Sequence, residues 1–194
     1  MASQLLIQFE KFPKEQALVG EMLLAYGEIE FALLDILSAV QKNLQTAIRT
    51  LFQLRSETHR LNIVEAICAP WFDNLNLGGQ FREGMIAVNH CKNIRNQYAH
   101  CLFVDDNPVL RFANLETTAK SKGEVCQVVA SPITLALLTK QRAYFDYADH
   151  MILWLDYTYR TKNGQPVAVD QPVPRPRRIS PPKLNSRGEG RTPR

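Results

Sequence analysis

No apolar run in the sequence approaches the length of about 18 residues that a membrane-spanning helix needs. The N-terminus also lacks the basic and then apolar pattern of a secretory signal. We therefore expect no membrane span and a cytoplasmic location. Apolar residues make up 45% of the 194 residues and charged residues 22%, which is typical of a globular domain with a sizeable core.

The sequence also lacks a C-x-x-C pair among its four cysteines, Cys68, Cys91, Cys101 and Cys126. Without an export signal, these residues are expected to be free thiols. The dipeptides His90-Cys91 and His100-Cys101 do suggest zinc, but neighbouring helical residues point about 100° apart and do not converge easily on one ion. We expect no metal and no cofactor.

Acidic residues are scarce at the C-terminal end. Residues 171–194 contain seven basic residues and one acidic residue, and six of the eleven prolines of the chain. With so few apolar side chains, residues 163–194 are predicted to form a disordered tail after a domain at 1–162. A basic tail can attract RNA by counterion release, and its proline-rich run suits a proline-recognising partner instead.

The spacing of apolar residues predicts a mainly α fold. Helices are expected at about 13–41, 44–69, 80–100 and 131–159, with Ser56 restarting the second and Ser131-Pro132 opening the last. Pro70 and the segment Asn74–Gly79, which closes with Gly78-Gly79, are expected to end the second helical stretch. Short β-prone runs at 101–104, 109–113 and 125–130 predict a small hairpin or meander within residues 101–130.

The most informative segment is Arg95-Asn96-Gln97-Tyr98-Ala99-His100, near the end of the third predicted helix. Imidazole transfers protons near neutral pH, and guanidinium binds phosphate oxygens in a planar fork. In a helical projection Tyr98 falls on the apolar arc with Ala87, Val88, Cys91 and Ile94. Asn89, Asn93, Asn96 and His100 form a polar stripe.

Arg95 lies at the edge of the apolar arc, where a guanidinium needs an acidic or anionic partner. The candidates are an RNA phosphate or one of the carboxylates Glu28, Glu30, Asp35 and Glu65. Arg95 and His100 are also separated by about 140° around the helix and ~7.5 Å along its axis. The Arg95 and His100 side chains of one motif therefore do not obviously reach the same phosphate. Two motifs related by a two-fold axis can, because each chain supplies part of the site.

The six residues resemble the R-x4-H motif of HEPN (higher eukaryote and prokaryote nucleotide-binding) domains, including the Asn after the Arg and the aromatic-Ala pair before the His. The segment Gly27-Glu28-Ile29-Glu30, followed by Leu33, is similar to the first helix of related bacterial members. The resemblance covers roughly residues 14–160. The predicted β segment within residues 101–130 distinguishes this chain from the family members that are entirely helical. The C-terminal tail lies outside the resemblance.

The resemblance implies a helical bundle and a metal-independent endoribonuclease that works as a homodimer on RNA. Arg95, Asn96 and His100 would be its catalytic residues, and an antitoxin or phage-defence component its partner. The alternative is a non-catalytic module that binds nucleotide, RNA or a protein. A helical subunit that serves only assembly is a third reading. Without the resemblance, the simplest interpretation of His100 is a residue at the end of a helix, where a cationic imidazole interacts favourably with the helix dipole. Arg95 is then a structural ion-pair partner.

Overall fold

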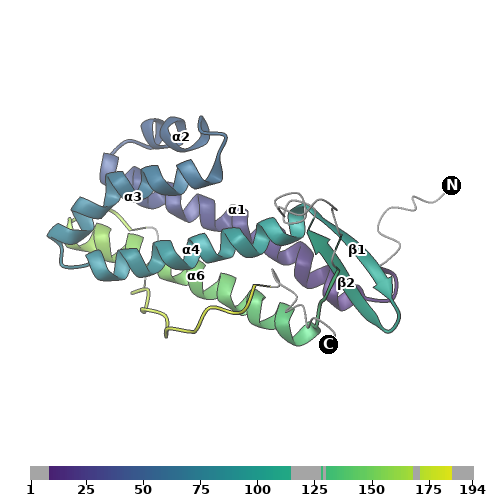
Figure 1. Ribbon diagram of the computed structural model, residues 1–194. Coiled ribbons are helices and arrows are strands. Elements are labelled where there is room, and N and C mark those ends of the chain that lie inside the picture. The colour runs from purple at the N-terminus through teal and green to yellow at the C-terminus, as the bar shows by residue number, and fades with distance from the viewer. Residues whose placement is uncertain (1–8, 115–127, 129, 168–170, 185–194) are drawn as a thin grey trace, which may run out of the picture. The chain divides into compact units, whose positions relative to one another are not determined.

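The computed structural model describes residues 9–114, 128, 130–167 and 171–184. Its elements are α1 (Pro13–Gln41), α2 (Leu44–Phe52), α3 (Glu57–Asn74), α4 (Gly78–Ala99), β1 (Cys101–Asp106), β2 (Val109–Asn114), β3 (Ser131–Pro132) and α6 (Leu135–Lys162) (Figure 1). The predicted class, mainly α with a small β insertion, is confirmed. In the described part of the chain, no helix combines the length and apolarity needed to cross a bilayer.

The second predicted helical stretch is two helices, and its end differs from the prediction. Ser56 caps α3 as expected, because its hydroxyl accepts a hydrogen bond from the backbone N–H of His59. Pro70 lies inside α3 rather than ending it, since Cys68 and Phe72 on either side are completely buried. The helix ends at Asn74, the first residue of the predicted segment 74–79, and Gly78-Gly79 begins α4.

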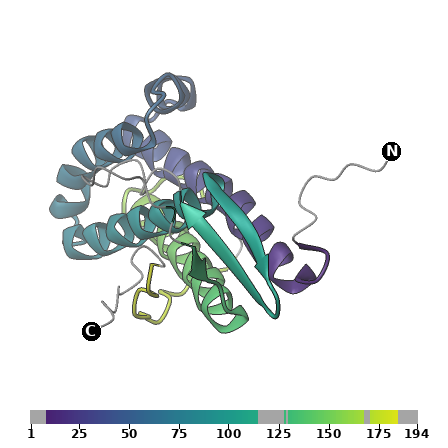
Figure 2. The same ribbon diagram turned by 45° about the vertical axis from the view of Figure 1, so that its right-hand side comes forward.

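The β insertion is a three-stranded antiparallel sheet in the order β1-β2-β3. Strands β1 and β2 form a hairpin (Figure 2). In it, Cys101 pairs with Asn114 and Asp106 pairs with Val109. Ser131 and Pro132 were predicted to begin a helix, but they pair with β2 as the short strand β3. A proline is tolerated on such an edge strand. Of the predicted run 125–130, the structure describes residues 128 and 130, and the others lie outside the described part.

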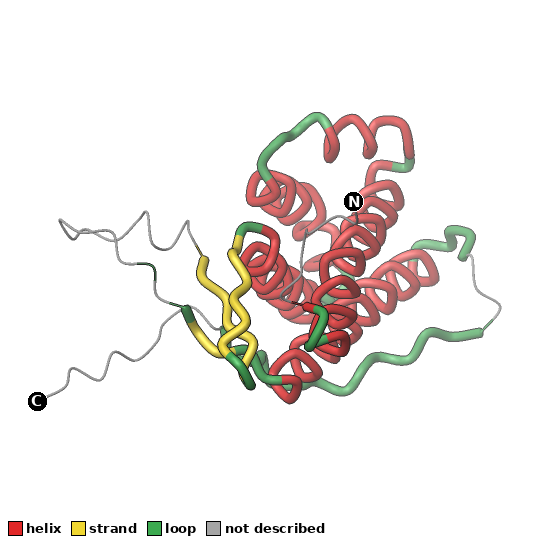
Figure 3. Tube along the Cα trace, turned by 90° about the vertical axis from the view of Figure 1, so that its right-hand side faces the viewer, coloured by secondary structure: helices red, strands yellow, loops and turns green. Residues whose placement is uncertain are grey.

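The chain divides into two compact units, which are described separately. The hairpin unit comprises Met1–Leu24, Asn93–Ala143 and Pro182–Arg194, and the helical unit comprises Ala25–Lys92 and Tyr144–Pro181. Helices α1, α4 and α6 contribute to both units. The hairpin unit contains the strands, which lie side by side in Figure 3.

The core of the helical unit joins α3, α4 and α6. Phe72 of α3 stacks on Phe81 of α4 with ring centroids 4.6 Å apart, and lies 5.2 Å from the ring of Tyr159 of α6. Gly84 lets α4 approach α6 closely, because a Cβ atom there would lie 3.0 Å from the side chain of Leu155. These contacts explain why the apolar faces of the three helices are buried.

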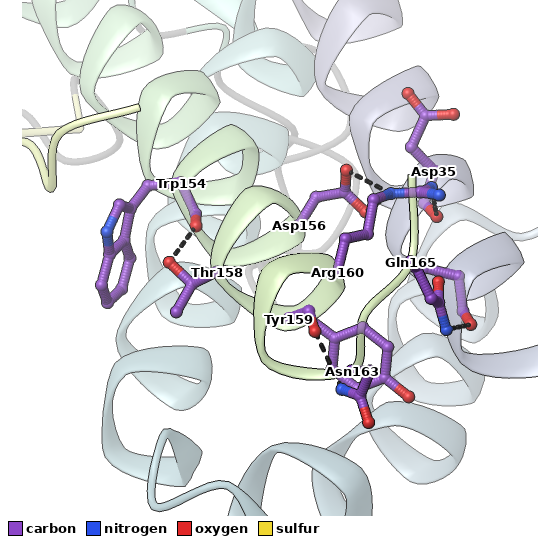
Figure 4. A network of polar contacts seen from close by, with 9 residues as sticks. Asp35, Trp154, Asp156, Thr158, Tyr159, Arg160, Asn163 and Gln165 are labelled. Atoms are coloured by element: carbon purple, nitrogen blue, oxygen red, sulfur yellow. Dashed lines mark hydrogen bonds and ion pairs between the residues drawn. The ribbon is translucent and has the colours of Figure 1, made fainter. Parts of the chain in front are cut away.

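Polar side chains at the end of α6 bind the end of α1 within the same unit (Figure 4). Arg160 forms two hydrogen bonds with Asp156, at 2.8 and 2.9 Å, and donates a third to the backbone oxygen of Asp35. Gln165 donates to the backbone oxygen of Ala39. Burial raises the pKa of Asp156, although the hydrogen bonds from Arg160 oppose this shift. Carbonyl groups of the last turns of α1 thus receive side-chain donors.

The C-terminal segment was predicted to be disordered over residues 163–194. Residues 171–184 do lack helix and strand (yellow in Figure 1), but they make specific contacts in both units. In the helical unit Arg175 and Arg178 bind Glu83. In the hairpin unit the backbone oxygen of Lys183 accepts a hydrogen bond from Gln141. The difference from the prediction arises because ion pairs replace the missing apolar burial, and prolines lower the entropy lost on docking. Residues 185–194 lie outside the described part.

Candidate functional site

Helix α4 buries the apolar arc that the sequence predicts. The five residues of that arc, Ala87, Val88, Cys91, Ile94 and Tyr98, are all at most 3% exposed. On the polar stripe, Asn89 and His100 are exposed, and Asn93 and Asn96 are half-buried. The helix therefore has the orientation that the projection predicts, with the polar stripe that includes Asn96 and His100 on its more accessible side.

Arg95 and Asn96 form a pair within the hairpin unit. The Arg95 guanidinium donates a 2.7 Å hydrogen bond from Nη1 to the Asn96 side-chain oxygen, and both residues are half-buried. Asn96, one of the three residues that the resemblance makes catalytic, holds the guanidinium in the structure. The hydrogen bond to Asn96 fixes one nitrogen of the guanidinium, and a guanidinium can bind phosphate oxygens in a planar fork.

The end of α4 is anchored by Tyr98. Its ring lies 5.5 Å from that of Phe112 on β2, and its hydroxyl donates a 2.7 Å hydrogen bond to the side-chain oxygen of Gln141 on α6. Gln141 is completely buried, and its amide nitrogen donates to the backbone oxygen of Lys183. Tyr98 is thus a core residue, as predicted, and it fixes the position of the residues on either side of it.

His100 is exposed in the turn between the end of α4 at Ala99 and the start of β1 at Cys101. Among the described residues it has no hydrogen-bond or ion-pair partner. Its imidazole can therefore reach a substrate, and no described side chain fixes its tautomer. Within one chain, the structure brings Arg95 together with Asn96 but not with His100.

The expected carboxylate partners of Arg95 have other positions. Glu30 forms a 2.7 Å ion pair with Arg60 inside the helical unit. Glu28 and Glu65 are exposed, and Asp35 is half-buried in the helical unit. Arg60 also lies over the ring of Phe52, 5.4 Å from its centroid. The Glu30–Arg60 ion pair could not be recognised from the sequence, because thirty residues separate its members.

One motif residue that the sequence did not single out is Gln97. It is only 7% exposed, and its side-chain oxygen has no hydrogen-bond donor among the described residues. A buried acceptor without a donor lowers stability by about 1–3 kcal/mol. Polarity alone predicts a surface position for glutamine, so no signal in the sequence indicates this burial.

Replacing Gln97 with leucine is expected to leave the free energy of unfolding unchanged or to raise it by about 1 kcal/mol, because the unpaired oxygen disappears. The measurement is urea unfolding followed by circular dichroism. Gln141→Leu is the matched control: it leaves the buried Tyr98 hydroxyl without its acceptor, and should lower the same free energy by about 1–3 kcal/mol. Equal losses in the two variants would contradict this explanation.

In each of the three described thiols, burial favours the neutral form over the thiolate. Burial raises the pKa of Cys68 and of Cys101 to about 12, and also raises the pKa of Cys91. Cys68, Cys91 and Cys101 are free, and Cys126 lies outside the described residues. Over the part of the chain that the structure describes, no three His, Cys, Asp or Glu side chains are grouped as ligands for a metal ion.

Comparisons with known proteins give no further assignment: no family model, curated protein or solved structure matches the chain.

Proposed function

We propose that the chain is a HEPN-like, metal-independent endoribonuclease in which His100 and Arg95 act on the phosphodiester. The observation that carries the proposal is the end of α4, where a guanidinium held by Asn96 and an exposed imidazole are five residues apart. The burial of Tyr98 supports it, because a site needs rigid support for its reacting groups. The resemblance of the motif supplies the reaction class.

The chemistry follows from these side chains. His100 acts as the general base that removes the proton of the ribose 2′-hydroxyl, or as the acid that protonates the leaving 5′-oxygen. The 2′-oxygen bonds to phosphorus, and the bond from phosphorus to the 5′-oxygen breaks. Arg95 neutralises the charge that develops on the phosphorane oxygens, and Asn96 positions Arg95. The products are a 2′,3′-cyclic phosphate and a 5′-hydroxyl.

A homodimer completes the site in this proposal. Arg95 and His100 of one chain make no hydrogen bond with each other, and cyclisation with expulsion of the 5′-oxygen needs both a base and an acid. A two-fold axis provides a second histidine and a second arginine at the same phosphate. The two motifs then share the roles of base, acid and charge stabiliser.

The proposal is tested by incubating the purified protein with a labelled RNA and with DNA of the same sequence, both in EDTA. RNA is expected to be cut and DNA to remain intact, since the mechanism needs the 2′-hydroxyl. An equal rate on both polymers, or loss of RNA cleavage in EDTA, would contradict it. Binding of RNA without cleavage would support the alternative of a non-catalytic binding module, which the slightly acidic remainder of the chain favours.

A toxin or phage-defence effector is the biological setting that the resemblance suggests. An antitoxin or another component of the defence system would then be the protein partner. This part of the proposal depends on analogy with the family alone.

A further inference from the structure

The C-terminal residues 171–181, here called the strap, converge on one carboxylate of the helical unit. Arg175 binds Glu83 through Nη2 at 2.8 Å, and Arg178 binds it through Nε at 3.3 Å. The Tyr147 hydroxyl also donates a hydrogen bond to Glu83 at 2.9 Å. The Glu83 side chain is 19% exposed, so the carboxylate is largely shielded from water at the point where the strap meets α4.

Aromatic contact adds to the ion pairs. The Arg175 guanidinium lies over the ring of Trp154 on α6, 5.4 Å from its centroid, in the geometry of a cation–π contact. Burial raises the pKa of Tyr144 and of Tyr147 to about 12, so both hydroxyls stay neutral at physiological pH and Tyr147 remains a donor. The strap thus has a defined binding surface made of Glu83, Tyr147 and Trp154.

The strap contributes little apolar burial to this surface. All its residues are exposed except Val173 and Pro176, which are half-buried. Between strap and helices lies an open cavity of about 410 Å³, walled by Tyr144, Tyr147, Arg178 and Ile179 among others. Electrostatic contacts therefore dominate the attachment, and contacts of this kind are weak and screened by salt.

The charges of the strap and its surface do not balance. One carboxylate faces two guanidinium groups, and the neighbouring Arg177 is exposed as a third cation. A single-stranded nucleic acid offers one negative charge per nucleotide and releases counterions when arginines bind it. The arginines that bind Glu83 within the chain are also suited to bind a phosphate backbone, but one guanidinium cannot readily serve both.

We propose that the strap is a detachable nucleic-acid-binding segment: single-stranded nucleic acid captures Arg175 and Arg178 from Glu83 and thereby uncovers the Tyr147 and Trp154 surface. The exchange goes beyond cleavage and does not require it. It needs only a phosphate backbone, so single-stranded DNA should act as RNA does.

The exchange can be followed at Trp154 in the full chain. The chain has two tryptophans, so Trp71→Phe leaves Trp154 as the only reporter. Adding an oligodeoxythymidylate at low salt should raise the quenching of Trp154 by acrylamide, and added salt should reverse the change. Because DNA has no 2′-hydroxyl, this readout is independent of whether the protein cleaves RNA.

Two variants in the Trp71→Phe background isolate the role of Glu83. Glu83→Gln should make Trp154 accessible to acrylamide before any oligonucleotide is added, and should bind the oligonucleotide about three- to ten-fold more tightly, since an internal competitor is lost. Glu65→Gln, which removes an exposed charge from α3, is the matched control and should do neither. Replacing both Arg175 and Arg178 with alanine should reduce the salt slope of binding by about 1.4.

The proposal fails if the oligonucleotide binds and leaves the quenching of Trp154 unchanged. It also fails if Glu83→Gln binds no more tightly than Glu65→Gln, or if the oligonucleotide does not bind at low salt. Any of these results would leave the proposed cleavage by His100 untouched, because that activity is measured on RNA by product formation.

Discussion

The His100→Ala variant is expected to cleave RNA about 10²- to 10⁴-fold more slowly than the wild type, which is the usual contribution of a general acid or base. The side chain is exposed beyond the end of α4 and makes no described contact, so its removal should not alter the fold. The measurement is the initial rate of cleavage of a labelled oligoribonucleotide in EDTA, together with the circular dichroism spectrum of each variant.

His150→Ala is the control for this change, because His150 is another exposed histidine, on α6. It should cleave at the wild-type rate. Arg95→Ala should be as inactive as His100→Ala. If each site takes residues from both chains, mixing the two inactive variants should restore part of the activity, because a mixed dimer can combine an intact Arg95 with an intact His100. Full activity in a folded His100→Ala protein would exclude the imidazole as a catalyst.

Replacing Phe72 with alanine is expected to lower the free energy of unfolding by about 3–5 kcal/mol. The ring is completely buried between Phe81 and Tyr159, so its removal leaves a cavity where α3, α4 and α6 meet. Close packing prevents the neighbouring rings from filling that space. The value is measured by urea unfolding, from the midpoint and slope of the transition.

Trp71→Ala provides the comparison, since Trp71 precedes Phe72 on the same helix and is 48% exposed. It removes a larger aromatic side chain, yet should lower the free energy of unfolding by less than about 1 kcal/mol. Equal destabilisation by the two changes would show that the packing of α3 differs from that described above.

Sequence periodicity predicted the helices because burial of an apolar stripe is a local pattern. The predicted bounds of α1, 13–41, are those of the structure. Met22, Ile29 and Ile36, which repeat at intervals of seven along this helix, are all completely buried. Predictions from short stretches of sequence were wrong where contacts between residues far apart in the chain determine the structure. Pro70 is tolerated within α3 because the residues around it are packed, and Ser131-Pro132 form a strand because β2 offers a partner.

In the candidate site too, some features could be predicted from the local sequence, and others depend on residues far apart in the chain. Residue types and spacing indicated Arg95, Asn96 and His100 as candidates, since the chemistry of each can be recognised one residue at a time. The burial of Gln97 and the docking of the strap on Glu83 could not be recognised. Each depends on partners far away in the sequence, and composition alone predicts exposure for a glutamine and disorder for a proline- and arginine-rich segment.

The central claim, that the end of α4 carries metal-free ribonuclease chemistry, is tested most directly by mass spectrometry of cleaved ends. The substrate is a DNA oligonucleotide with one internal ribonucleotide, incubated with the wild-type protein in EDTA. We expect one cut, which leaves a 2′,3′-cyclic phosphate on the ribonucleotide and a 5′-hydroxyl on the next residue. A 3′-hydroxyl with a 5′-phosphate, or cuts between deoxynucleotides, would contradict the claim.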